Sequence, residues 1–162
     1  LGYLEKVLCL LLREGVPIRD METILETLGD HAGALKDIDI VTEYVRQALK
    51  RTITRRFAEA NSLRVITVDP KVEDTIVASV KKSDAGSYLA MDPDLIQKIV
   101  NITSGEIDKV KDVIPNVIIL TSPIVRIYFK KLIDQFIPNI TVLSYSEIDN
   151  TAQIQAIGNI AM

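Results

Sequence analysis

The side chains that could act as nucleophiles, bases or metal ligands are few in this chain, and they are scattered along it. Cys9 lies in an apolar stretch with no neighbouring base to form a thiolate, so we expect a small buried hydrophobic side chain. His31 is the only histidine, and we expect it at a helix end, as a cap or on the surface. One Cys and one His do not make a zinc site without added carboxylates, so no metal site is predicted.

Two carboxylates follow a predicted strand near the end of the chain. Glu147 and Asp149 occupy a position where α/β proteins often place function, and an ordinary polar loop is the other interpretation. A small α/β enzyme working near Ser122 and Glu147 is one hypothesis. The sequence contains neither GxGxxG nor a P-loop, so no cofactor is predicted, and we expect a protein that is not an enzyme.

A basic cluster is the strongest local charge feature. Its members recur at i,i+4 spacing, so we expect them to cover much of the outward side of one helix. The cluster comprises Arg46, Lys50, Arg51, Arg55 and Arg56. An ordinary solvated face, a protein contact and a nucleic-acid contact all fit it. No aromatic side chains or glycine loops accompany the cluster, so we expect no nucleic-acid partner and keep a nucleic-acid-binding module as the alternative function.

The composition is that of a globular protein. The chain has 162 residues, 48% of them hydrophobic and 25% charged, with a net charge of −3 and a pI near 5.2. No global positive field attracts nucleic acid, and a single cysteine fits a reducing compartment. No apolar run reaches the roughly 18–20 residues of a membrane helix. The chain begins inside a helical pattern, so we expect it to be a piece of a longer protein.

The first part of the chain has the periodicity of three amphipathic helices. The first ends near Gly15, Pro17 opens the second, and Gly29 closes it. A third helix is predicted as one element from about residue 39 to residue 57. Three helices with short connections form a small bundle, and we assign it residues 1–60.

The remaining residues, 61–162, alternate between strand and helix patterns. We expect a strand at 63–68, a helix at 72–80, a polar turn at 83–87, a short strand at 88–91 and a helix beginning at 92–93. Residues 117–120 form an apolar strand, Ser122 and Pro123 start a helix, and residues 141–145 return as a strand. That helix has a predicted core stripe of Val125, Phe129, Leu132, Ile133 and Phe136.

Strand, helix and strand in so few residues imply a right-handed parallel crossover, and residues 153–157 add a last strand. The predicted fold class is therefore α+β. A small helical bundle is followed by a small α/β subdomain with a mixed sheet that contains a βαβ crossover.

Several segments resemble the family of bacterial flagellar and type III secretion export gates. The most specific is Leu11–Glu26, with the sequence LLREGVPIRDMETILE. The resemblance continues at residues 42–49, 51–54, 120–126 and 142–148, in the family's order, while residues 71–112 match nothing. The last stretch, together with residues 152–155, is more similar to the flagellar branch than to the injectisome branch.

The resemblance implies an inner-membrane protein whose large cytoplasmic portion has four subdomains. This chain looks like the third, helical subdomain at residues 1–60 and the mobile fourth, α/β subdomain at residues 61–162. The family assembles as a ring, generally nine-membered, and its implied partners are further copies, chaperone–cargo complexes, the export ATPase stalk and other gate proteins. The chaperone site lies mostly on the earlier subdomains.

Candidate interface residues follow from the resemblance together with the charge pattern. Three of them border the turn between the first two helices, where fixed charges suit either intrachain ion pairs or ring contacts: Arg13, Arg19 and Asp20. The basic cluster supplies the others.

Overall fold

The structure, a computed structural model, describes residues 2–31, 33, 37–84 and 86–162. The chain forms two compact units. The first unit comprises Leu1–Asn61 and the later segment Ser146–Ala152, and the second comprises Ser62–Tyr145 and Gln153–Met162. The α+β fold class is confirmed, and the parallel and antiparallel strands lie in separate sheets.

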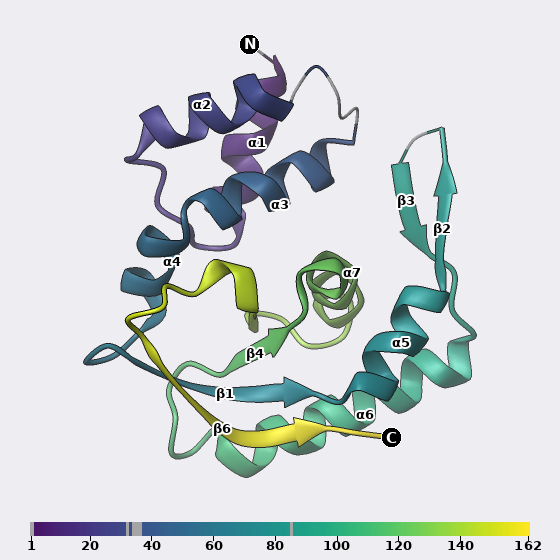
Figure 1. The fold of residues 1–162 in the computed structure, drawn as a ribbon. Coiled ribbons are helices and arrows are strands. Elements are labelled where there is room, and N and C mark those ends of the chain that lie inside the picture. Colours follow the sequence, from purple (N-terminus) through teal and green to yellow (C-terminus); the bar gives the residue numbers. More distant parts are fainter. Residues whose placement is uncertain (1, 32, 34–36, 85) are drawn as a thin grey trace. The chain divides into compact units, whose positions relative to one another are not determined.

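The first unit is helical (Figure 1). Its helices are α1 (Gly2–Arg13), α2 (Met21–His31), α3 (Ile38–Ala48) and α4 (Lys50–Phe57). Both α1 and α2 pack against α3. The turn after α1 needs Gly15, whose φ is +74°, a left-handed conformation that favours glycine. The N–H of Val16 there donates to Leu11 O at 3.0 Å, which satisfies one of the last carbonyls of α1.

The predicted single helix from residue 39 to residue 57 is instead two helices, α3 and α4. They meet at Leu49, whose backbone has φ −91° and ψ 22°. The Leu49 N–H donates to both Val45 O and Arg46 O at 3.0 Å, so the backbone tightens without losing a hydrogen bond. The apolar stripe runs on through the break, since Leu49 is 2% exposed and Ile53 is fully buried. Periodicity therefore does not show the break.

The second unit is built on a parallel sheet of four strands in the order β5-β4-β1-β6. The strands are β1 (Ser62–Val68), β4 (Ile118–Thr121), β5 (Thr141–Ser144) and β6 (Gln153–Ile160). All three pairings are parallel, and β4 is buried along its whole length. A strand covered on both faces needs apolar side chains throughout, which explains the continuous run in β4.

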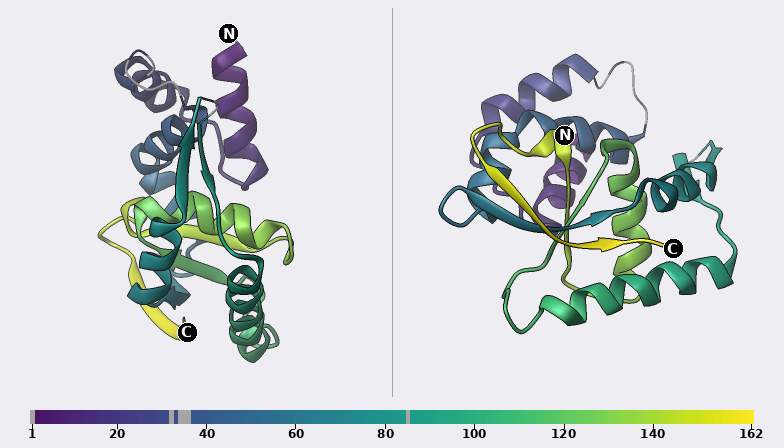
Figure 2. Two further views of the ribbon diagram at one scale, coloured as in Figure 1. Left: turned by 90° about the vertical axis from the view of Figure 1, so that its right-hand side faces the viewer. Right: turned by 60° about the horizontal axis from the view of Figure 1, so that its bottom comes forward.

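Three helices pack on this sheet, and each begins with a proline. They are α5 (Pro70–Ala78), α6 (Pro93–Val110) and α7 (Pro123–Asp134). Asp69 and Asp92 cap the first two, each accepting a backbone N–H two residues later, at 3.1 Å and 2.9 Å. The views in Figure 2 show α6 running beside β6, while α5 packs against α7.

A two-stranded antiparallel hairpin interrupts the parallel pattern between α5 and α6. It pairs β2 (Val80–Ser83) with β3 (Gly86–Leu89) and extends beyond the helices of its unit (Figure 2, left). The short strand at 88–91 was predicted two residues too late, and β2 was missed. Residues 80–83 carry the sequence VKKS and are mostly exposed, so no alternation marks them as a strand. One residue of the predicted turn, 85, lies outside the described residues.

The crossover from β4 through α7 to β5 confirms the predicted strand–helix–strand unit. Ser122 occupies the N-cap position of α7, but its side chain makes no capping hydrogen bond. The residue is held instead through its backbone N–H, which donates to Glu73 Oε2 at 2.7 Å. A carboxylate of α5 thus holds the turn between β4 and α7.

Replacing Glu73 with alanine is expected to destabilise the second unit by about 1–2 kcal/mol, because the half-buried Ser122 N–H loses a charged acceptor. Asp74 is the matched control. It is the exposed next residue of the same helix, and its alanine variant is expected to unfold like the wild type. Urea unfolding followed by circular dichroism measures the difference. Equal losses in the two variants would contradict this function of Glu73.

The core of the second unit lies between the sheet and its helices. Val125, Phe129 and Ile133 of α7 are fully buried there, as the predicted stripe requires. Phe136 is an exception, because its side chain is 47% exposed. Since α7 ends at Asp134, helical spacing no longer sets the direction of residue 136.

Candidate protein-interaction surface

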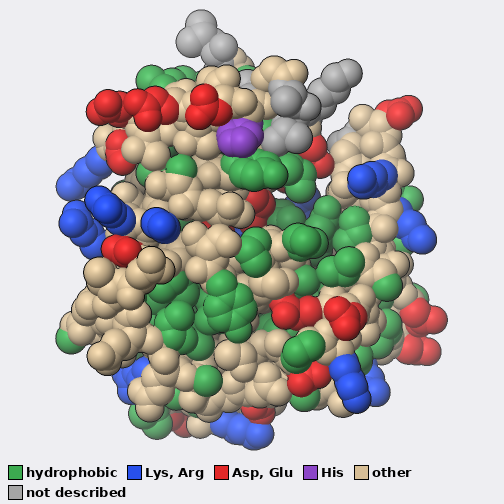
Figure 3. Space-filling view, in the orientation of Figure 1, with side chains coloured by type: hydrophobic (Ala, Val, Ile, Leu, Met, Phe, Trp, Pro, Cys, Tyr) green, Lys and Arg blue, Asp and Glu red, His purple; other side chains and the backbone are tan. Residues whose placement is uncertain are grey.

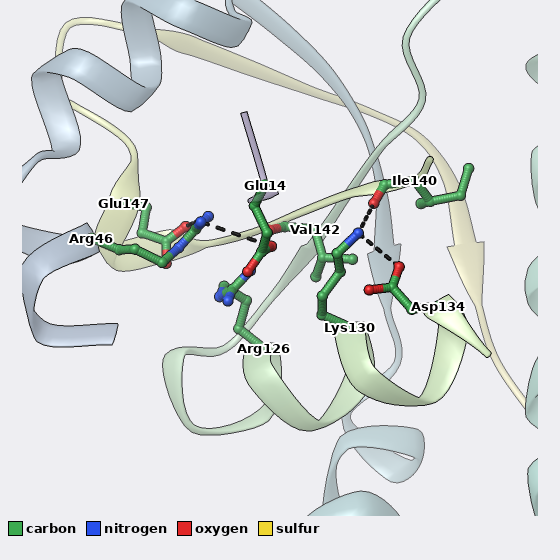
Figure 4. A network of polar contacts seen from close by, with 8 residues as sticks. All are labelled: Glu14, Arg46, Arg126, Lys130, Asp134, Ile140, Val142 and Glu147. Atoms are coloured by element: carbon green, nitrogen blue, oxygen red, sulfur yellow. Dashed lines mark hydrogen bonds and ion pairs between the residues drawn. The ribbon is translucent and has the colours of Figure 1, made fainter. Parts of the chain in front are cut away.

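Arg46 lies in the interior of the first unit. Its side chain is 1% exposed, and its guanidinium pairs with the fully buried Glu147. Nε donates to Glu147 Oε2 at 3.0 Å and Nη2 donates to Glu147 Oε1 at 2.8 Å, which is a bidentate arrangement. Figure 4 shows the two side chains next to each other, with Glu14 on the other side of the guanidinium. The Oε1 of Glu14 lies 3.8 Å from Nη1. The expectation that Arg46 belongs to an outward basic face is therefore wrong.

The position of Arg46 follows from the buried side of its helix. The buried residues on this side follow one another at spacings of four, three and four, and they are Thr42, Arg46, Leu49 and Ile53. The arginine therefore occupies a core position and needs a counter-charge. Glu147, which we placed in a polar loop or at a functional strand end, supplies it from 101 residues away.

The segment Ser146–Ala152 is held to the end of α4 by hydrogen bonds that use its backbone. Thr54 Oγ1 accepts from the N–H of Asp149 at 2.8 Å and donates to the carbonyl of Glu147 at 3.4 Å. The side-chain amide of Asn61 donates to the carbonyl of Thr151 at 2.6 Å. The late segment is thus an integral part of the first unit.

The other members of the cluster form an exposed surface that we call the α4 basic face. It comprises Lys50, Arg51, Arg55 and Arg56. Figure 3 shows basic side chains gathered over α4. The guanidinium carbon of Arg56 lies 5.1 Å from the centroid of the Phe57 ring, within reach of a cation–π interaction. Within the part of the chain that the structure describes, the side chains of the other three make no ion pair or hydrogen bond.

A polar pocket of about 330 Å³ opens beside this face. It is lined by Arg51 and Arg55 from α4 and by Asp149 and Thr151 from the late segment, with Thr54, Ala58 and Asn61. Two guanidinium groups offer donors in a planar arrangement that suits a carboxylate, and Asp149 offsets one of the two positive charges. The pocket therefore favours a single anionic group.

An acidic surface lies on α2, and the sequence reasoning did not single it out. Glu22, Glu26 and Asp30 recur every four residues and are exposed, and Leu25 beside them is 50% exposed. We call these four residues the α2 acidic face, and Figure 3 shows acidic side chains over α2. No ion pair joins the three carboxylates to any described residue. The i,i+4,i+8 spacing of like charges was the signal that pointed to this surface.

The three residues around the first turn have different environments. Arg13 is exposed in the last turn of α1 and lines a pocket of about 390 Å³ with Glu5, Lys6, Cys9 and others. Arg19 is exposed and pairs with no described carboxylate. Asp20 caps α2: Oδ1 accepts the Thr23 N–H at 3.1 Å and Oδ2 accepts the Thr23 hydroxyl at 2.7 Å. These bonds, led by the hydroxyl, lower the pKa of Asp20 below 3.8.

Replacing Asp20 with alanine is expected to fray the first turn of α2, because the Thr23 N–H loses its acceptor. Since the folded-state pKa lies below 3.8, the capping contribution is complete above that pH and is lost as the pH falls through the lower value. Hydrogen exchange of the α2 amides, corrected for intrinsic pH dependence, measures both effects. In Asp20→Ala, the first-turn amides of α2 should lack the protection from exchange that the cap provides, and acid should cause no further loss of it. An unchanged α2 in Asp20→Ala would contradict the capping assignment.

The two side chains with catalytic potential near the start of the chain have ordinary environments. Cys9 is exposed, so the prediction of a buried thiol is wrong. His31 stacks on Tyr44 with ring centroids 4.4 Å apart and an interplanar angle of 11°, on the helix-end position that we expected. Among the described residues, no group of three or more His, Cys, Asp or Glu side chains is placed to hold a metal ion. No helix within the described ranges has the length and apolarity of a membrane span.

Comparison with known proteins connects these features to a group of secretion proteins. Residues 1–153 match the FHIPEP family. The chain is 40% identical to the flagellar biosynthesis protein FlhA of Bacillus subtilis over 97% of its own length, and 31% identical to the invasion protein InvA of Salmonella typhimurium. It spans 23% of the length of each of these relatives.

Solved structures share the fold over nearly the whole chain. The Chlamydia pneumoniae CdsV protein superposes with a TM-score of 0.88 and 36% identity, covering 98% of this chain and 46% of that one. The nonameric EPEC SctV-C superposes with a TM-score of 0.84 and 31% identity, covering 96% and 47%. CdsV in complex with CdsO superposes with a TM-score of 0.86 and 35% identity, covering 99% and 47%.

The fold and the family match agree on the class of protein. The chain belongs to the FHIPEP family. Its relatives are export gate proteins of flagella and of type III secretion systems.

Proposed function

We propose that this chain is a cytoplasmic part of a type III protein export gate and that it assembles into a ring through its first unit. The observation that carries this proposal is its similarity to SctV-C, which forms a nonamer and shares this fold with a TM-score of 0.84. The exposed charges of α2 and α4, most of which form no ion pair with a described residue, supply surfaces that a contact between subunits would use.

The subdomain assignment belongs to this proposal. Residues 1–60 correspond to the third cytoplasmic subdomain of the gate and residues 61–162 to the fourth, with the late segment Ser146–Ala152 completing the third. In the parent protein, which lies in the bacterial inner membrane, this part is on the cytoplasmic side and has no catalytic function. The ring has nine subunits, as SctV-C does.

A flagellar gate is favoured over an injectisome gate. The identity to FlhA of Bacillus subtilis is 40%, and that to InvA of Salmonella typhimurium is 31%. The proposed cargo is therefore flagellar export substrate delivered by chaperones. The structure of CdsV with CdsO supports a contact of this region with a further component, and we propose the export ATPase stalk for that role. Candidate interface residues in this chain are Arg13, Arg19, Asp20, Lys50, Arg51, Arg55 and Arg56, while buried Arg46 supports the unit from inside.

A chimeric gate tests the proposal in cells. The corresponding segment of Bacillus subtilis FlhA is replaced by this chain in a strain that lacks its own FlhA, and flagellin secretion and swimming are measured. The expected result is restored secretion. The same segment taken from Salmonella InvA is the matched control, and it is expected to restore less.

Absence of secretion from a chimera that reaches the membrane at the wild-type level would overturn the export-gate assignment. Equal rescue by the two segments would overturn the flagellar preference alone. Sedimentation of the isolated chain at low salt over a range of concentrations tests ring assembly directly, since the proposal requires it to self-associate.

A further inference from the structure

The first unit carries two exposed faces of opposite sign on different helices. The α2 acidic face presents three carboxylates, and the α4 basic face presents four cations. None of the three carboxylates pairs with a described residue, and Lys50, Arg51 and Arg55 are likewise without ion pairs there. Charged side chains that lack internal partners remain available to a second molecule.

The spacing of charge on the two faces is the same. Glu22 and Glu26 are four residues apart, as are Arg51 and Arg55, so each pair is separated by about 6 Å along its helix axis at 1.5 Å per residue. Two carboxylates can therefore face two guanidinium groups at once. Such pairs are charge-assisted and often bidentate, which gives direction as well as attraction.

Local shape adds to the charge pattern. The pocket of about 330 Å³ lies where Arg51 and Arg55 meet the late segment, and it favours one anionic group. Glutamate side chains on an exposed helix are long enough to enter such a pocket. Leu25, which is 50% exposed beside Glu22 and Glu26, gives the acidic face an apolar side chain to bury in the same contact.

We propose that the α2 acidic face of one copy binds the α4 basic face of the next copy, with a glutamate of α2 entering the pocket between Arg51 and Arg55. This inference rests on the proposed function, because it names the contact by which the first unit assembles. A patch that binds a different patch gives a heterologous contact, which repeats head to tail and closes into a ring when the rotation permits. The contact is electrostatic, so rising salt weakens it.

Two charge-reversal variants of the full chain test the pairing. The α2 variant carries Glu22→Lys and Glu26→Lys, and the α4 variant carries Arg51→Glu and Arg55→Glu. In each variant alone, the α2 and α4 faces carry charge of the same sign and repel each other across the contact. We therefore expect self-association at least about tenfold weaker than that of the wild type. Mixed in equal amounts, they should associate again, because each reversed face then meets an opposite charge on the other variant.

The controls reverse the same number of charges in the second unit. Lys81→Glu with Lys82→Glu matches the α4 variant, and Asp84→Lys with Asp112→Lys matches the α2 variant, since all four side chains are exposed. We expect these controls to associate like the wild type. Sedimentation velocity gives the association state, and circular dichroism confirms that every variant is folded.

The outcomes separate the inference from the proposed function. A wild-type chain that stays monomeric at low salt and high concentration overturns ring assembly, and with it this contact. Self-association that persists in both reversed variants overturns the pairing and leaves the proposed function standing. In a third outcome, neither variant self-associates alone and the two do not associate when mixed. These faces then bind something other than each other, such as an acidic or a basic partner protein, and this too overturns the pairing.

Discussion

Replacing Glu147 with glutamine is expected to lower the free energy of unfolding of the first unit by about 3–5 kcal/mol, the usual cost of removing one partner from a buried ion pair. The Arg46 guanidinium is 1% exposed and donates both of its short hydrogen bonds to this carboxylate. Without this negative charge, the buried cation keeps only the longer contact of 3.8 Å between Nη1 and Glu14 Oε1. Arg46→Met is expected to cost a similar amount, because the buried carboxylate of Glu147 loses both hydrogen bonds from the guanidinium.

The double variant Arg46→Met with Glu147→Leu separates loss of the pair from loss of packing. It is expected to be more stable than either single variant, since neither charge of the buried pair remains without the other and the replacements fill part of the space. Hydrogen exchange of the α3 and α4 amides reports on the first unit specifically. Arg55→Met is the control, because this exposed arginine should contribute less than about 0.5 kcal/mol. Additive losses in the double variant would contradict a coupled pair.

Replacing Phe129 with alanine is expected to destabilise the second unit by about 3–5 kcal/mol, through lost apolar burial and the cavity that remains. Phe129 is fully buried in the core between α7 and the sheet. Phe136 provides a control of the same chemistry seven residues further along the chain. Its side chain is 47% exposed, so Phe136→Ala should cost far less.

Urea unfolding of both phenylalanine variants, followed by circular dichroism, gives the comparison. A conservative variant, Phe129→Leu, is expected to recover part of the loss because it refills most of the volume. Similar destabilisation in the two alanine variants would contradict the burial difference.

The local elements of the fold could be predicted from sequence wherever the residues that start, stop or define an element lie within that element or next to it. The apolar run of β4, followed at once by Ser122 and Pro123, predicts a strand that turns directly into a helix. The structure has α7 at this position. The helix stop at Gly15 is equally local, because a left-handed residue is needed there. Such features depend on backbone chemistry within a few residues.

The misassigned side chains depend on partners far along the chain. Arg46 was placed on the surface because its counter-charge, Glu147, lies 101 residues later. Cys9 was placed inside because its neighbours are leucines. The buried positions of α1 are Val7 and Leu11, however, and Cys9 lies halfway between them, about 200° around the helix from each. The basic face of α4 was predicted, whereas the acidic face of α2 was visible in the spacing and was overlooked.

The division of the chain between the two units has a consequence for synthesis. The polypeptide passes from one unit to the other after Asn61, after Tyr145 and after Ala152. On the ribosome, the helices of the first unit emerge early, but Arg46 lacks its bidentate, fully buried counter-ion until Glu147 has been made. The second unit in turn lacks its edge strand until β6 has followed. Neither unit can therefore finish folding much before the other, although domains usually fold in the order in which they are translated.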